Sequence, residues 1–138
     1  MSRHADYVPH GVIPAVLLPF ADDLGIDEKS FRKHLREVAA TANLSAITVN
    51  AHSTEVASCS FEEQRRILDI AGDEIGDRLP IVNGVWADGS LEAARIARMV
   101  VTRKRPSGLT VAPRCEPFHS STSGLASRAL GNHSVTAL

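Results

Sequence analysis

Short apolar runs alternate with longer amphipathic stretches through most of the chain. The runs are nearly continuous in aliphatic residues, which is typical of strands buried on both faces of a parallel sheet. They lie at 11–18, 46–49 and 79–82. The stretches between and after them carry apolar residues at helical spacing. The helices they predict cover 28–43, 61–75 and a stretch from residue 90 onward. This alternation predicts a βα repeat with parallel strands and right-handed crossovers.

Capping residues support each predicted helix. Asp27 is placed as the N-cap of the first helix, and Ser60 with Glu63 forms the capping-box pattern before the second. Gly76 is placed as the C-cap of that second helix, and Ser90 is placed to cap the third. The apolar side chains predicted to face the core are Phe31, Leu35, Val38, Ala42, Phe61, Ile67, Leu68, Ala71, Ile75, Leu91, Ala94, Ile96 or Ala97, and Val100.

Two architectures fit this order of elements: an open doubly wound sheet, or part of a (β/α)8 barrel. No Gly-x-Gly-x-x-Gly pattern follows the first run, which weakens the dinucleotide-binding version of the open sheet. Pro14 lies inside the first run, where it cannot donate to a strand ladder. The length of 138 residues suits one domain.

The second apolar run leads into the most chemically varied stretch of the chain. Within six residues it holds an amide, an imidazole, two hydroxyls and a carboxylate. These belong to Asn50, His52, Ser53, Thr54 and Glu55. The carboxyl ends of parallel strands are where α/β proteins usually carry their chemistry. We therefore predict the functional site at 50–55.

Other chemistries for this stretch are less favoured. A metal set of His52, Glu55 and Cys59 matches no familiar ligand spacing, so no metal is expected. Ser53 lacks an evident base and acid pair in the sequence, which favours a binding role over nucleophilic hydrolysis.

Composition narrows the class of protein. The net charge of −1 provides no field for nucleic acid or an anionic membrane, and no apolar run approaches the roughly 20 residues that span a bilayer. Cys59 and Cys115 form no metal or redox spacing, which favours a reducing, cytoplasmic setting. Nucleic acid and membrane are thus not expected as partners. The basic stretch 103–105 is a weak argument for a nucleic-acid-binding module, which is the least favoured alternative.

The pattern changes after Met99. The cations at 103–105 and a proline interrupt the third helix, and 107–112 then resumes as a plausible fourth strand. Residues 114–138 have no helical or strand period and are predicted to be poorly ordered. We interpret this double loss of pattern as the sign of a reading-frame disturbance.

Seven segments together carry a family likeness: 11–20, 22–27, 49–55, 61–65, 79–85, 90–93 and 107–113. In this order and spacing they resemble the dihydrodipicolinate synthase / N-acetylneuraminate lyase family of class I aldolases. The resemblance implies a TIM barrel, here an N-terminal part of about four βα units. The domain prediction is an N-terminal extension at 1–10, a partial barrel at 11–113 and an atypical tail at 114–138.

The family's chemistry is implied by the same resemblance. A lysine forms a Schiff base with pyruvate or a related 2-oxo acid, a tyrosine relays protons, and no cofactor is needed. The family's Gly-Thr-Thr-Gly-Glu loop matches 51–55, so His52 and Ser53 take the places of the two threonines that contact the substrate carboxylate. Asn50, Thr54 and Glu55 are expected to support the loop. Thr54 stands where the family has glycine, which predicts backbone strain if that position needs positive φ.

The family's lysine and relay tyrosine have no counterparts among 1–138, so no catalytic residue is assigned and the chain is expected to be a truncated, catalytically incomplete copy. The alternative is a non-catalytic half-barrel that binds a small carboxylate or assembles with another chain. Full-length relatives are expected to be homo-oligomers whose partner is a small 2-oxo acid.

Overall fold

The structure, a computed structural model, describes residues 7–8, 10–101 and 109–113. The predictions for 103–105 and for the tail at 114–138 lie outside these residues. The helices are α1 (Glu28–Ala39), α2 (Phe61–Ile75) and α3 (Ser90–Val101), with two short 3-10 helices, η1 (His52–Thr54) and η2 (Val56–Ser58). The strands are β1 (Ile47–Val49), β2 (Ile81–Val85) and β3 (Leu109–Pro113).

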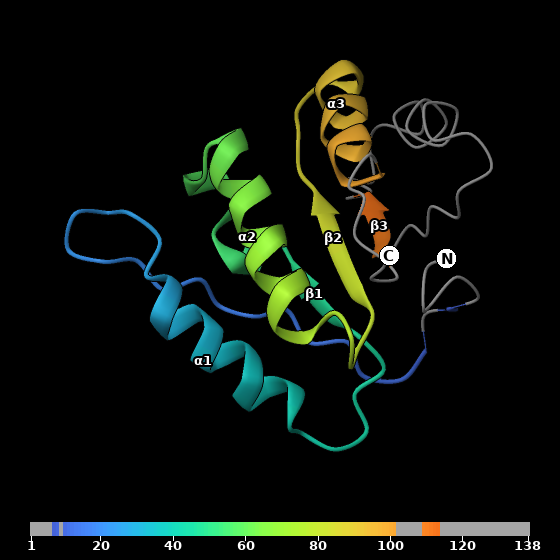
Figure 1. The fold of residues 1–138 in the computed structure, drawn as a ribbon. Coiled ribbons are helices and arrows are strands. Elements are labelled where there is room, and N and C mark those ends of the chain that lie inside the picture. The colour runs from blue at the N-terminus through green and yellow to red at the C-terminus, as the bar shows by residue number, and fades with distance from the viewer. Residues whose placement is uncertain (1–6, 9, 102–108, 114–138) are drawn as a thin grey trace.

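The three strands form one parallel sheet in the order β1-β2-β3. Ile47 lies opposite Ile81, and Ile81 lies opposite Leu109. Figure 1 shows α1 and α2 side by side, with α2 in front of β1 and α3 beside β2 and β3. The predicted βα repeat is therefore confirmed, including a strand near 107–112, although β2 begins and ends later than predicted.

The first predicted strand is only partly formed. Residues 11–18 run beside β1 but pair at isolated parallel bridges, Val12 with Leu44 and Ala15 with Thr48. These bridges are three residues apart on one segment and four apart on the other, so the register slips by one residue. The Pro14 carbonyl accepts from the Thr48 N–H at 2.8 Å, but Pro14 has no N–H with which to extend the ladder.

Hydrogen bonds confirm the predicted caps of α1 and α2, whereas the prediction that Ser90 caps α3 is wrong, because Ser90 is the first residue of that helix and the Gly89 carbonyl accepts from the Ala93 N–H. The Asp27 carboxylate accepts from the Ser30 N–H at 3.0 Å. The Ser60 N–H donates to Glu63 Oε2 at 2.7 Å, and the Ser60 hydroxyl accepts from the Glu63 N–H at 3.3 Å, which completes a capping box. Gly76 is the C-cap of α2, but its φ of −62° is right-handed, so the left-handed freedom of glycine is not used there.

Two further helix predictions are wrong. α1 ends at Ala39, four residues early; the chain then turns toward β1 with a left-handed φ of 63° at Asn43, and Ala42 is exposed. Leu91 is 89% exposed rather than buried. It lies on the same face of α3 as the exposed Arg95, while the inward face is built from alanines, Ile96 and Val100.

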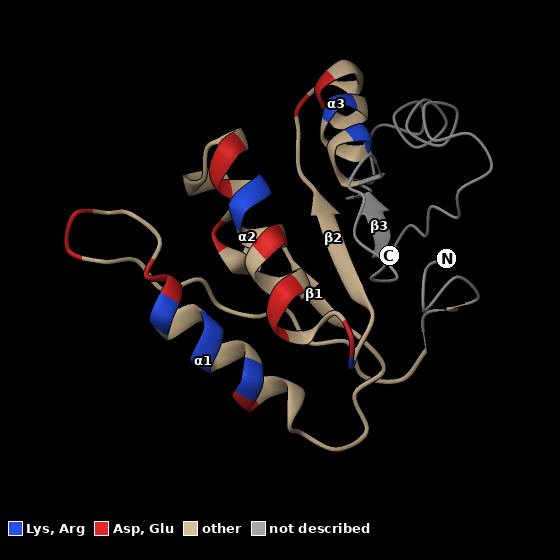
Figure 2. Cartoon of the chain, viewed as in Figure 1, with Lys and Arg blue, Asp and Glu red and all other residues tan. Residues whose placement is uncertain are grey.

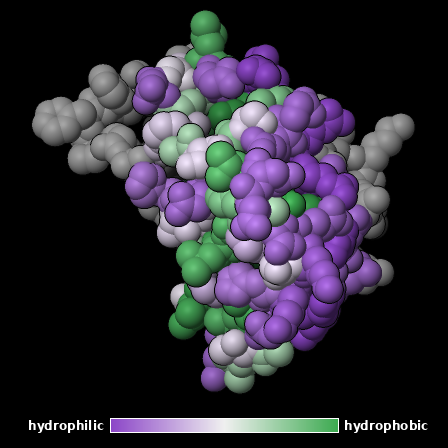
Figure 3. Space-filling view, turned by 90° about the vertical axis from the view of Figure 1, so that its left-hand side faces the viewer, coloured by the Kyte–Doolittle hydropathy of each residue, from purple (hydrophilic) through white to green (hydrophobic). Residues whose placement is uncertain are grey.

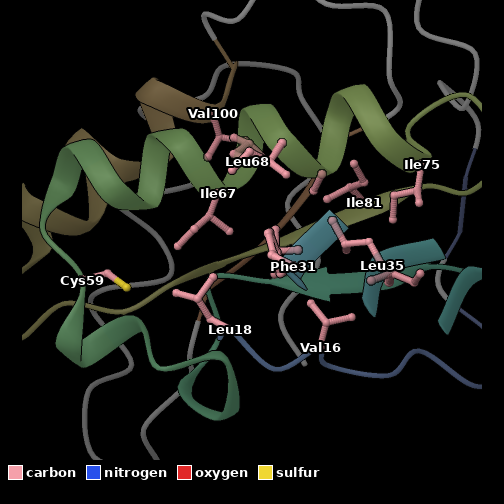
Figure 4. Close-up of a cluster of buried hydrophobic side chains, with 14 of the residues drawn as sticks. Val16, Leu18, Phe31, Leu35, Cys59, Ile67, Leu68, Ile75, Ile81 and Val100 are labelled. Carbon is pink, nitrogen blue, oxygen red and sulfur yellow. The ribbon is translucent and has the colours of Figure 1, made fainter. Parts of the chain in front are cut away.

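The core lies between the sheet and the helices. Figure 4 shows side chains from α1, α2 and β2 converging there, among them Phe31, Leu35, Ile67, Ile75 and Ile81. Each of these five is at most 1% exposed. The described helices are amphipathic or short, and none of them has the length and apolar character needed to cross a bilayer.

An ion-pair network joins the outer faces of α1 and α2, where Figure 2 shows both signs of charge. Arg32 bonds Glu28 at 2.8 Å and Glu74 at 3.1 Å, and Arg36 bonds Glu74 at 2.6 Å. Arg66 also contacts Glu28. Hydrogen bonds from Arg32 and Arg66 lower the pKa of Glu28, and those from Arg36 and Arg32 lower the pKa of Glu74.

We expect acid to destabilise the fold partly through this network. Because both carboxyl pKa values are lower in the folded state, their stabilisation is fully present above the unfolded glutamate pKa of about 4.3 and is lost as the pH falls through the folded values. The effect is modest because the groups face solvent. Melting temperatures from pH 7 to pH 3 should fall less steeply for Glu28→Gln/Glu74→Gln than for the parent chain. Equal slopes would contradict this role.

Candidate functional site

The loop that leaves β1 turns twice through left-handed backbone. Asn50 has φ of 52° and Glu55 has φ of 59°. Asparagine tolerates this conformation well, whereas glutamate adopts it less often. Between these two residues lies η1, and after Glu55 the chain continues through η2 to the start of α2. The predicted site stretch 50–55 is therefore a tight connection at the carboxyl end of β1.

Thr54 closes this connection on itself. Its hydroxyl accepts from the Ala51 N–H at 2.6 Å and donates to the Ala51 carbonyl at 2.7 Å. The Thr54 N–H also donates to that carbonyl at 3.0 Å. Thr54 is 2% exposed. The prediction of backbone strain at Thr54 is wrong, because the residue with positive φ is its neighbour Glu55. A buried hydroxyl that bonds both Ala51 groups gives Thr54 a clear supporting role.

His52 and Ser53 are the exposed residues at the tip of this connection. They open η1, so their backbone N–H groups have no partner inside the 3-10 turn. Within the described residues, neither their N–H groups nor their side chains take part in a hydrogen bond as donors. The loop therefore places an exposed hydroxyl-bearing residue and an exposed imidazole-bearing residue next to each other, with backbone N–H groups that no described residue accepts from.

A buried amide network lies behind the loop and was missed by sequence reasoning. Asn50 Nδ2 donates to Asn83 Oδ1 at 2.8 Å and to the Gln64 carbonyl at 2.8 Å. Asn50 and Asn83 are both fully buried, and Gln64 is 8% exposed. One signal was present: each of two successive apolar runs ends in an asparagine. Only the pairing of β1 with β2 shows that the two asparagines meet.

Gly84 was also missed. A Cβ built on Gly84 would lie 2.3 Å from the Asn50 carbonyl oxygen and 2.9 Å from Ala51 Cα. These are backbone atoms, which cannot rotate away as a side chain can. The absence of a side chain at Gly84 is thus what lets the loop backbone lie directly against β2.

Cys59 follows the loop as a buried thiol. Burial, with the nearby carboxylates of Glu63 and Glu55, raises the pKa of this thiol to about 11. It is therefore protonated at neutral pH and unsuited to nucleophilic attack. No group of three His, Cys, Asp or Glu side chains in the described part of the chain is arranged to hold a metal ion.

Comparison with known proteins identifies the family. The sequence model of the dihydrodipicolinate synthetase family matches residues 8–125. This chain belongs to the dihydrodipicolinate synthetase family. A 4-hydroxy-tetrahydrodipicolinate synthase from Salinibacter ruber is 31% identical over 108 residues, which are 78% of this chain and 35% of that protein. The resemblance predicted from the sequence motifs is therefore confirmed.

Solved structures show the same fold for this family member. The N-acetylneuraminate lyase of Proteus mirabilis superposes with a TM-score of 0.75 at 16% identity, covering 93% of this chain and 45% of that one. A catalytic lysine mutant of Ruminococcus gnavus sialic acid aldolase gives a TM-score of 0.71 at 18% identity, covering 87% and 40%. These lyases are TIM barrels. The chain spans less than half the length of the relatives it matches.

Proposed function

We propose that residues 50–55 form the carboxylate-binding wall of a site for pyruvate or a related 2-oxo acid. The observation that carries the proposal is that His52 and Ser53 lie exposed at the carboxyl end of β1, with donors that no described residue accepts from. In position they match the two threonines of the family's loop, and family membership gives that match its weight.

The chemistry of the two residues fits this role. A carboxylate accepts short, charge-assisted hydrogen bonds from hydroxyl and amide donors, and Ser53 supplies both kinds of donor. His52 supplies an imidazole whose ring N–H can donate a further hydrogen bond to a bound keto acid. No described residue accepts a hydrogen bond from the N–H group or the side chain of either residue.

The family reaction proceeds through a Schiff base on lysine. Lys29 and Lys33 lie on the exposed face of α1, away from the core side of that helix, and Lys104 lies outside the described residues. We propose that residues 1–138 bind the keto acid without forming the imine and are catalytically incomplete. Reduction with borohydride in the presence of pyruvate should leave the mass of the chain unchanged. A covalent adduct would contradict this.

Replacing Ser53 by alanine is expected to weaken pyruvate binding about tenfold, because a hydrogen bond to a charged group contributes about 1.5–3 kcal/mol. Isothermal titration calorimetry on the full chain measures this directly. Ser58→Ala is the matched control, since Ser58 is an exposed serine in the adjoining η2. Equal affinities for the parent and Ser53→Ala, or no binding by the parent, would count against the proposed site.

Assembly with another chain is a second candidate. Val12 is 59% exposed and Leu17 63% exposed on the segment that pairs with the outer side of β1. Figure 3 shows hydrophobic side chains gathered along one margin of the molecule. An exposed apolar margin of this kind favours association. Light scattering after size-exclusion chromatography should show association that Leu17→Glu reduces; a monomer at all concentrations would rule it out.

A further inference from the structure

The buried amide network holds the chain by hydrogen bonds at Asn50, where the candidate loop begins, and at Cys59, just before α2. Asn50, at the start of the loop, donates through Nδ2 to Asn83 Oδ1 on β2 and to the Gln64 carbonyl on α2. The Gln64 side chain separately donates through Nε2 to the Cys59 backbone carbonyl, just before α2, at 3.1 Å. The Asn50 side chain thus joins the start of the loop to the Asn83 side chain on β2 and to the Gln64 backbone on α2, and the Gln64 side chain holds the connection where it meets α2.

The hydrogen bonds fix the orientation of two of these amides. Both hydrogens of Asn50 Nδ2 are used, so its amide cannot be reversed without placing an oxygen against two acceptors. Asn83 accepts from Asn50 and donates through Nδ2 to the Gly84 carbonyl at 2.7 Å, so it too has one favoured orientation. These bonds therefore fix both the position and the orientation of the backbone at Asn50, where the loop begins.

Two features separate this network from ordinary core packing. Asn50 Oδ1 and Gln64 Oε1 are buried and have no partner among the described residues, which makes the network costly for stability. Asn50 also holds a left-handed φ of 52° only two residues before His52. Apolar side chains at these positions would stabilise the core better than amides with unpaired oxygens. Buried amides fix the orientation of the loop backbone, which a binding site needs.

We propose that Asn50, Asn83 and Gln64 are positioning residues that set the placement of the His52 and Ser53 donors for a 2-oxo-acid carboxylate. This inference rests on the proposed function for the identity of the ligand. The three residues do not contact the ligand themselves; they act by holding the backbone from which the donors project.

The test replaces Asn50 by glycine, which keeps the left-handed backbone accessible and removes the amide. Asn43→Gly is the matched control, because Asn43 has a φ of 63°, is exposed, and lies outside the network. Three properties of the full chain are measured: pyruvate affinity, melting temperature, and the amide NMR signals and hydrogen exchange of His52 and Ser53 without ligand. Asn83→Ala is a second variant if Asn50→Gly does not fold.

We expect Asn50→Gly or Asn83→Ala to remain folded, to bind pyruvate about tenfold more weakly, and to shift the His52 and Ser53 amide signals with faster exchange. Asn43→Gly should change none of these. Unchanged affinity in a folded network variant would overturn the inference while leaving the proposed function intact. If the parent chain does not bind pyruvate, the proposed function fails. The positioning role is tested separately without ligand: it is overturned if the amide signals and hydrogen exchange of His52 and Ser53 are the same in the network variants as in the parent chain.

Discussion

Replacing Phe31 by alanine is expected to remove about 3–5 kcal/mol from the free energy of unfolding. Phe31 is fully buried, and it projects from α1 into the cluster formed with α2 and the sheet. Removing its ring loses the transfer free energy of that side chain and leaves a cavity that rigid neighbours fill only in part. The loss is a large fraction of the 5–15 kcal/mol that typically stabilises a domain.

Denaturant unfolding followed by circular dichroism measures this change. Leu91→Ala is the matched control, because Leu91 is 89% exposed and its truncation should alter stability by less than about 0.5 kcal/mol. A loss below about 1 kcal/mol for Phe31→Ala would show that α1 does not pack on the sheet as described.

Replacing Gly84 by alanine is expected to cost about 1–3 kcal/mol and to abolish pyruvate binding. The new Cβ would lie 2.3 Å from the Asn50 carbonyl oxygen and 2.8 Å from its carbon, so either β2 or the candidate loop must move. Because both contacts are with backbone, no rotamer change relieves them. The displacement would fall on the residues that precede His52 and Ser53.

Gly89→Ala is the control for this prediction. A Cβ at Gly89 has no atom within 4 Å, so its effect should stay below about 1 kcal/mol and leave binding unchanged. Stability and pyruvate affinity are measured on the same samples by thermal unfolding and calorimetry. Parent-like binding by a folded Gly84→Ala chain would contradict the close contact between β2 and the loop.

Local signals in the sequence were enough for the order of elements and most helix starts. Asp27 and the Ser60–Glu63 pair act within one turn of the helix that they cap, so their bonds can be read from spacing alone. The βα alternation follows from the length and continuity of the apolar runs. The candidate loop was found for the same reason, since His52 and Ser53 are adjacent in the chain.

Features that depend on contacts between distant segments were not predictable. The Asn50–Asn83 bond needs the register of β1 against β2, and the importance of Gly84 needs the path of the loop over that strand. The left-handed turn at Asn43, between α1 and β1, is likewise not revealed by apolar spacing. Leu91 fitted a helical period, yet the alanine-rich face of α3 is the one that packs.

The most direct test of the central claim is an amide NMR titration of the ¹⁵N-labelled chain with pyruvate. The account predicts saturable shifts centred on the His52 and Ser53 amides, smaller shifts at neighbouring loop residues, and none on the outer face of α1. Saturable shifts centred elsewhere, or no shifts at His52 and Ser53 at any pyruvate concentration, would contradict it.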